Sequence, residues 1–179
     1  MNVIGIVGYP ASGKGEVSAI AKNNGVPVVV MGDMIRRAVR DAGLELTDEN
    51  IGSTARALRA QLGMDAVAML TAREIEKIDA PLVIIDGIRG DAEVKYFKSV
   101  FFAFTLLHID ACFATRLSRM QTRGRSDDTK TPETLRARDE REESFGLARA
   151  IAMADARIEN ESTREAFEEK VRAYFGGAQ

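Results

Sequence analysis

The sequence predicts an α/β protein in which helices cover both faces of a parallel sheet. Short apolar segments alternate with longer segments whose apolar residues recur every three or four positions, as they do in helices. The candidate strands are residues 3–7, 26–31, 82–85, 102–109 and 156–159. The first four are rich in Val, Ile and Phe without clean alternation, which is typical of strands buried on both faces.

The longer segments predict the helical layers. They are residues 13–23, 34–42, 49–62, 65–78, 91–100, 113–121, 132–143, 147–153 and 164–174. Pro27 and Pro81 stand where strands begin, and Pro132 stands in a first helical turn behind Thr131, a candidate N-cap. A length of 179 residues is usual for one domain, so we expect a single domain over residues 1–179.

Composition and charge exclude several classes of protein. Hydrophobic residues make up 45% of the chain and charged residues 29%, which is ordinary for a globular domain. The formal net charge of -2 disfavours a protein that wraps long nucleic acid. The single cysteine, Cys112, excludes an intramolecular disulfide and a cysteine-based metal site. No stretch approaches the roughly 18 apolar residues of a membrane span, so we expect a soluble protein. The single cysteine suits a reducing cytoplasm.

A glycine-rich loop connects the first candidate strand to the first candidate helix. Its glycines let successive backbone N–H groups point into one concavity at a helix N-terminus, where the helix dipole also favours an anion. Lys14 adds a positive charge that can bridge the β- and γ-phosphates of a nucleotide. We therefore expect an ATP site with Mg²⁺. The expected contacts come from Gly8, Tyr9, Pro10, Ala11, Ser12, Gly13, Lys14, Gly15 and Glu16.

One position of the loop departs from the common pattern. The residue after the lysine is Gly15, where a Ser or Thr usually coordinates Mg²⁺. The metal must then be held differently. The carboxylate of Glu16 would repel a triphosphate unless it faces Mg²⁺, the water shell of the ion or an arginine. An ordinary acid in a first helical turn is the other interpretation of Glu16.

Charged residues follow the second and third candidate strands. Asp33 and Asp86 are expected at the carboxyl ends of parallel strands, where ligands bind in open α/β sheets, and carboxylates there can order Mg²⁺ through water. Arg36 and Arg89 follow the same strand ends, and their planar guanidinium groups suit the clamping of an acceptor phosphate. An ion pair at the surface is the alternative for each arginine.

Several motifs resemble those of nucleotide kinases. Gly-Lys-Gly at residues 13–15 resembles the loop of adenylate kinases and other nucleoside monophosphate kinases. Residues 31–36 (MGDMIR) and 43–49 (GLELTDE) resemble their monophosphate-binding region, and residues 86–90 (DGIRG) resemble their Asp-Gly-Phe-Pro-Arg element without its proline. Over its whole length the chain is similar to an archaeal family of adenylate-kinase-related P-loop proteins, which implies nucleotide binding.

This resemblance also implies an architecture. We expect a three-layer P-loop kinase fold whose five-stranded parallel sheet has the order 2-3-1-4-5. A helical acceptor-binding insertion is expected near residues 34–78, and a short lid near residues 122–131. The predicted reaction is transfer of the γ-phosphoryl group of ATP to a nucleotide-like small acceptor.

The acceptor stays open between two types. Met31 stands where adenylate kinases commonly carry a hydroxyl residue that helps recognise the acceptor base. Asp33, together with residues 154–160 (ADARIEN) and Ser162, resembles dephospho-coenzyme A kinases, in which an aspartate at this place acts as a base. A phosphate acceptor needs no general base, whereas an alcohol benefits from one. Asp33 is thus a candidate for either a base or a metal ligand.

A cluster of arginines surrounds the polar stretch at residues 122–131, which resembles the lid of nucleotide kinases. Its members are Arg116, Arg119, Arg123, Arg125, Arg138 and Arg141. We expect Arg123 and Arg125 to stabilise the charge that spreads over the migrating phosphoryl group. Arg116 and Arg119 can share a helix face with Arg123 and converge on one phosphate. A solvated helix face is the alternative, and Asp127 and Asp128 are expected to hold the open lid.

Other classes of function remain open. An ATP hydrolase or nucleotide-dependent switch acting on a macromolecular partner would share this fold. An RNA-binding accessory role for the arginines is disfavoured by the pI near 5.6. For His108 we expect a satisfied histidine in the core or at a sheet end, and no partner for nucleophilic chemistry is evident for Cys112.

Overall fold

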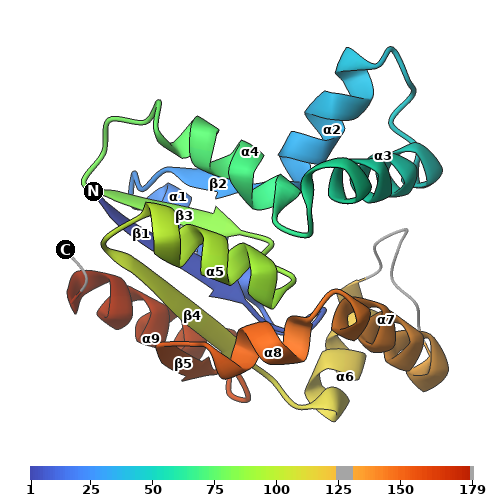
Figure 1. Cartoon of the computed structure of the whole chain (residues 1–179). Helices are drawn as coiled ribbons and strands as arrows, with labels where there is room; N and C mark the ends of the chain where they lie inside the picture. Colours follow the sequence, from blue (N-terminus) through green and yellow to red (C-terminus); the bar gives the residue numbers. More distant parts are fainter. Residues whose placement is uncertain (124–130, 178–179) are drawn as a thin grey trace.

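The computed structural model describes residues 1–123 and 131–177, with only the backbone of Arg123. Its centre is a five-stranded sheet of order β2-β3-β1-β4-β5, in which every neighbouring pair is parallel (Figure 1). The strands are β1 Asn2–Val7, β2 Val28–Val30, β3 Leu82–Asp86, β4 Phe104–Asp110 and β5 Ala156–Glu159. The predicted fold class and strand order are confirmed.

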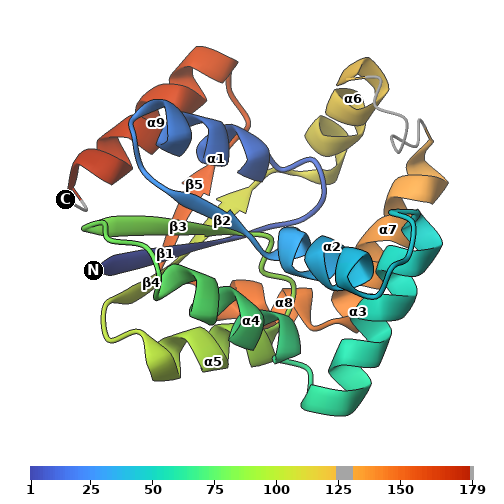
Figure 2. The same ribbon diagram turned by 90° about the horizontal axis from the view of Figure 1, so that it is seen from above.

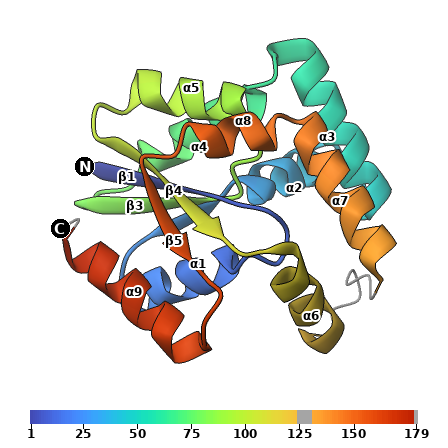
Figure 3. The same ribbon diagram turned by 90° about the horizontal axis from the view of Figure 1, so that it is seen from below.

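Helices cover both faces of this sheet. They are α1 Lys14–Asn23, α2 Met31–Asp41, α3 Asp48–Leu62, α4 Ala66–Ile75, α5 Asp91–Val100, α6 Phe113–Arg123, α7 Pro132–Ser144, α8 Leu147–Ala152 and α9 Arg164–Gly177. Figures 2 and 3 show α1 and α9 on one face and α4, α5 and α8 on the other. No helix among the described residues is long and apolar enough to cross a membrane.

Two apolar clusters hold the layers together. In β1, Ile4 and Ile6 pack toward the cluster that contains residues of α1 and α9, whereas Val3 and Val7 pack toward the cluster of α4, α5 and α8. All four side chains are at most 3% exposed. Burial on both faces explains why the strands carry continuous apolar sequences, since successive side chains of a strand point to opposite faces.

The main boundary error concerns β2. The strand begins at Val28 and ends at Val30, and Met31 already begins α2, so residues 26–31 are not one strand. Met31 is 2% exposed, so its burial continues the apolar run of the strand into the first turn of the helix. The boundary between β2 and α2 therefore lies inside one continuous apolar run and could not be located from hydrophobicity alone. Smaller differences are that α4 ends at Ile75 and that α6 extends to Arg123.

The segment expected as an acceptor-binding insertion has two parts. α2 and α3 lie beyond the carboxyl ends of the strands (Figures 1 and 2). α4, by contrast, belongs to a covering layer of the sheet, because Val67, Ala68 and Ile75 are buried in the core cluster. The expected lid falls largely on residues 124–130, which lie outside the described part of the chain.

Candidate active site

The loop between β1 and α1 is shaped by two glycines. Gly13 adopts a φ of 113°, and a Cβ at this position would collide with Nδ2 of Asn160. A Cβ at Gly8 would collide with the carbonyl oxygen of Ile109 and with Oγ of Ser12. Glycine is required at both positions because neighbouring groups approach the backbone closely. The result is a compact loop at the N-terminus of α1, as the sequence predicts.

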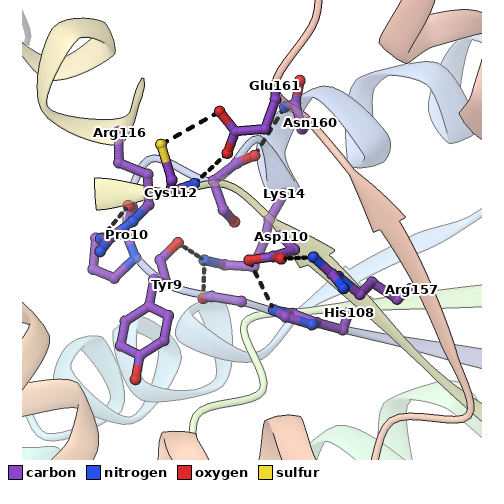
Figure 4. A network of polar contacts seen from close by, with 12 residues as sticks. Tyr9, Pro10, Lys14, His108, Asp110, Cys112, Arg116, Arg157, Asn160 and Glu161 are labelled. Carbon is purple, nitrogen blue, oxygen red and sulfur yellow. Dashed lines mark hydrogen bonds and ion pairs between the residues drawn. The ribbon is translucent and has the colours of Figure 1, made fainter. Parts of the chain in front are cut away.

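Lys14 turns its ammonium group into this loop. Its Nζ donates hydrogen bonds to the carbonyl oxygens of Gly8 (2.5 Å) and Tyr9 (2.9 Å), as Figure 4 shows. Burial lowers the pKa of Lys14 to about 8, while the negative charges of Asp86 and Glu142 act in the opposite direction. The loop therefore holds a cation at the place where a phosphate chain would bind.

Asn160 and Arg119 brace the loop from the side of β4 and β5. Nδ2 of Asn160 donates to the carbonyl oxygen of Ser12 (2.9 Å), and Nη2 of Arg119 donates to Oδ1 (2.9 Å) and to the carbonyl oxygen (2.8 Å) of Asn160. Asn160 is 5% exposed. No role of its own was predicted for Asn160, although it lies within the motif at residues 154–160.

Arg116 braces the loop in a second place. Its Nη1 donates to the carbonyl oxygen of Pro10 (3.2 Å), and its two terminal nitrogens donate to Asp139 of α7 (2.8 and 2.7 Å). The guanidinium also lies 4.9 Å from the ring centroid of Tyr9. The pKa of Tyr9 is raised to about 12, mainly by burial and to a lesser extent by the hydrogen bond to Glu143. The guanidinium of Arg116 is paired with Asp139, and Arg119 lines the cleft whereas Arg116 does not.

The residues near Lys14 fit a magnesium ion that is bound together with a triphosphate. Asp86 ends β3, and Oγ of Ser18 donates to its Oδ2 (2.7 Å). A Cβ on Gly15 would meet nothing within 4 Å, so no clash excludes a hydroxyl side chain there. Among the described residues, no group of three or more His, Cys, Asp or Glu side chains is arranged to hold a metal. One carboxylate with phosphate oxygens and waters is a usual Mg²⁺ environment. The role of Ser18, one turn after Lys14, was missed.

A cleft of about 1070 Å³ extends from the loop to both sides. On the side of β4 and β5, its wall includes Arg119, Asn160, Ser162, Arg164 and Phe167. On the side of β2 and β3, its wall includes Val30, Gly32, Arg36, Asp86 and Arg89. Arg138 and Glu142 line it from α7. The loop therefore lies between two parts of one cleft, which we call its two arms: one beside β4 and β5, the other beside β2 and β3.

Arg36 and Arg89 both line the arm beside β2 and β3, as the sequence predicts. Arg36 donates to Asp33 (2.6 Å), and Arg89 donates to Glu142 (3.2 Å). Asp33 does not lie at the end of a strand, because α2 begins at Met31 and includes Asp33 in its first turn. Its side chain is 58% exposed and does not belong to the cleft lining.

Glu16 lies in the first turn of α1 and lines the cleft. Nη2 of Arg164 at the start of α9 donates to its Oε1 (2.6 Å). Of the partners expected for Glu16, an arginine is therefore present. This ion pair neutralises the carboxylate next to the phosphate loop.

The remaining arginines of the expected lid are only partly described. Arg123 ends α6 as backbone alone, and Arg125, Asp127 and Asp128 lie outside the described residues. Arg138 lines the cleft, and Nη2 of Arg141 lies 3.9 Å from Oε1 of Glu142.

His108 and Cys112 lie near the loop without joining the cleft lining. Nε2 of His108 is buried, has no hydrogen-bond partner among the described residues, and lies 3.9 Å from Oδ1 of Asp110. Burial lowers the pKa of His108, which favours the neutral ring. Cys112 directly precedes α6, and its thiol lies 3.4 Å from Oγ1 of Thr115. The thiol lies equally far, 3.4 Å, from Oε2 of Glu161 (Figure 4).

Comparisons with known proteins agree with this architecture. Two solved structures cover nearly the whole chain. The structure of TT1252 from Thermus thermophilus has a TM-score of 0.68 and 22% identity, and covers 99% of this chain and 98% of its own. Shikimate kinase from Aquifex aeolicus has a TM-score of 0.54 and 14% identity, covering 98% and 97%. At these identities the likeness shows the fold alone.

Sequence relatives are much more similar. A UPF0200 protein of Methanoculleus marisnigri is 57% identical over 173 residues, which are 97% of this chain and 94% of the relative. A UPF0200/UPF0201 protein of Archaeoglobus fulgidus is 47% identical over 96% of this chain, although the match spans 54% of that longer protein. Residues 4–146 match the family described as AAA domain. With its phosphate loop and kinase-like sheet, the chain belongs to this P-loop family and, within it, to the archaeal UPF0200 proteins.

Proposed function

We propose that the protein is a phosphotransferase that moves the γ-phosphoryl group of ATP to a nucleotide-like small acceptor. One observation carries this proposal: a single cleft has two arms that meet at Lys14, and each arm has its own cationic side chains. A hydrolase needs one bound nucleotide and a water. A second arm that contains Arg36 and Arg89 favours a second, anionic substrate.

The two arms are assigned to the two substrates. The arm beside β4 and β5, with Arg119 and Asn160, would take the donor nucleotide. The arm beside β2 and β3, with Arg36 and Arg89, would take the acceptor. Mg²⁺ bound with the triphosphate would neutralise charge on its β- and γ-oxygens, and Asp86 is the carboxylate that would hold it.

The chain's own groups would then align the reactants. An acceptor oxygen attacks the γ-phosphorus while the bond to the bridging β–γ oxygen breaks, so that ADP leaves with the bonding electrons. Lys14 would balance the charge on the leaving side, and Arg89 and Arg138 would face the migrating group from the opposite wall. Fixed cations of this kind stabilise the transition state because they need no reorientation during transfer.

An assay of ADP release tests the proposal directly. The protein is incubated with ATP and Mg²⁺ and, in turn, with nucleoside monophosphates, dephospho-coenzyme A and small alcohols, with Lys14→Ala as the blank. We expect at least one anionic acceptor to stimulate ADP release. Release that no acceptor stimulates would instead favour an ATP hydrolase or a nucleotide-dependent switch.

A further inference from the structure

A buried carboxylate lines the cleft near the phosphate loop, close enough to act on the charge of Lys14. Glu142 of α7 is 7% exposed and lines the cleft together with Lys14 and Arg89. Its Oε1 accepts a hydrogen bond from Nη1 of Arg89 at 3.2 Å. The arginine is more accessible, since its side chain is 49% exposed whereas that of Glu142 is 10% exposed. A negative charge is thus built into a site whose ligands are expected to be anions.

Neighbouring contacts of α7 fix the position of this carboxylate. Leu135 is fully buried, and Asp139 forms two hydrogen bonds with Arg116. Glu143 accepts a hydrogen bond from the hydroxyl of Tyr9 at 2.7 Å. Leu135, Asp139 and Glu142 follow one another at spacings of four and three residues and so lie on one helix face. Glu142 is therefore held toward the loop by the docking of the whole helix.

A carboxylate on Arg89 affects which ligands can bind. A phosphate group offers more oxygens and more charge than a carboxylate, and it can accept two parallel hydrogen bonds from one guanidinium. It can therefore displace Glu142 from Arg89. A neutral alcohol offers no charge to replace Glu142 on Arg89, so breaking the ion pair for an alcohol would cost free energy without compensation.

We propose that Glu142 competes with the anionic group of the acceptor for Arg89, and that it thereby restricts the acceptor to molecules that carry a phosphate. The position of Asp33 agrees with this restriction. Asp33 would be the base for an alcohol, but it lies outside the cleft lining and is held by Arg36. That the competing anion belongs to an acceptor rests on the proposed function. The competition between Glu142 and an anion for Arg89 does not.

Binding of inorganic phosphate to the full chain tests the competition without turnover. Isothermal titration calorimetry would compare the wild type with Glu142→Gln and Glu142→Asp. We expect Glu142→Gln to bind phosphate roughly three- to tenfold more tightly, as for removal of one competing charged hydrogen bond. Glu142→Asp, whose shorter side chain withdraws from Arg89, should fall between the two. The matched control is Glu140→Gln, the same change of charge at an exposed position of α7, which should leave the affinity unchanged.

A double-mutant cycle shows whether Glu142 acts through Arg89. In an Arg89→Gln background, Glu142→Gln should no longer tighten phosphate binding, because the guanidinium for which the two anions compete is gone. A gain that persists in this background would overturn the proposal and indicate a general charge effect. Unchanged or weaker phosphate binding by Glu142→Gln would also overturn it.

The outcome is separable from that of the proposed function. Tighter phosphate binding by Glu142→Gln, combined with ADP release that no acceptor stimulates, would support the competition and reject the transferase. If transfer does occur, Glu142→Gln should lower KM for a phosphate-bearing acceptor more than it changes kcat. A purely structural role of Glu142 does not predict this split.

Discussion

The two arms of the cleft are built differently. Beside β4 and β5, Arg119 and Asn160 donate to carbonyl oxygens, and the partners of Asn160 include the backbone of Ser12. Beside β2 and β3, the side-chain partners of Arg36 and Arg89 within the described part of the chain are carboxylates, and the two arginine side chains are 45% and 49% exposed. Backbone partners do not leave when a ligand arrives, whereas carboxylate partners can be exchanged for phosphate. The part of the first arm formed by Arg119 and Asn160 is therefore preorganised, whereas Arg36 and Arg89 in the second arm are paired in a way that an anion can replace.

The strongest test of the preorganised part is the loss of its cation. Lys14→Ala should reduce ATP affinity or turnover by roughly a hundredfold or more, as for removal of a fixed donor to a phosphate. Binding is measured by calorimetry and turnover by ADP release. Lys22→Ala, in the last turn of α1, is the matched control. If Lys14→Ala and the wild type bound ATP with equal affinity, the loop would not be part of the ATP site.

Asn160→Ala tests whether the hydrogen bonds of Asn160 with Ser12 and Arg119, rather than the loop sequence alone, shape the phosphate loop. The change leaves the carbonyl oxygen of Ser12 and the guanidinium of Arg119 without this partner, so we expect a loss of about 1–3 kcal/mol in the free energy of unfolding. ATP affinity should fall as well. Chemical denaturation measures the first effect. Asn24→Ala, at an exposed helix end, should cost less and leave ATP affinity intact.

The pH dependence of binding tests the buried state of Lys14. Burial lowers the pKa of Lys14 from 10.5 to about 8, so the ligand-free protein loses this charge as the pH rises through 8. ATP favours the charged form, and its affinity should therefore fall up to about tenfold per pH unit above 8, with uptake of a proton on binding. Calorimetry at pH 8.5 in two buffers of different ionisation enthalpy measures that proton. ATP binding without proton uptake would contradict a lowered pKa of the buried Lys14.

The smallest expected effect concerns magnesium. Ser18→Ala removes the hydrogen bond that orients Asp86 and should weaken the Mg²⁺ dependence of ATP binding by about three- to tenfold, while Mg²⁺-free binding stays the same. Gly15→Ser should restore part of the loss, because the position has room for a hydroxyl. Fluorescence titration with Mn²⁺ or Mg²⁺ follows the ion directly. A loss of equal size with and without the ion would reject this role of Ser18.

The difference between the arms also explains how far the sequence could predict the site. Lys14 and the glycines of the loop follow from a contiguous motif, and the sheet order follows from the resemblance to nucleotide kinases. Arg36 and Arg89 were found because each follows a strand end, where ligands bind. The partner of Arg89 was not found, since Glu142 lies in a highly charged helix whose pattern resembles a solvated surface.

The hydrogen bonds from Arg116 and Arg119 to the loop were not predicted, for a similar reason. Arg116 and Arg119 were expected to meet a phosphate because their spacing places them on one face of α6. Spacing says which side chains share a face but not which carbonyl oxygens of a distant loop face them. In the structure, these contacts join residues more than 100 positions apart, as between Arg119 and Ser12.

Transfer of labelled phosphate from ATP tests the central claim most directly. The protein is given ATP labelled at the γ-phosphate, Mg²⁺ and a nucleoside monophosphate, and the products are separated. The two-armed cleft predicts that label appears in the acceptor, and that Arg89→Gln raises KM for the acceptor while the affinity for ATP stays the same. Label that appears only in inorganic phosphate, at a rate independent of every acceptor, would contradict the account.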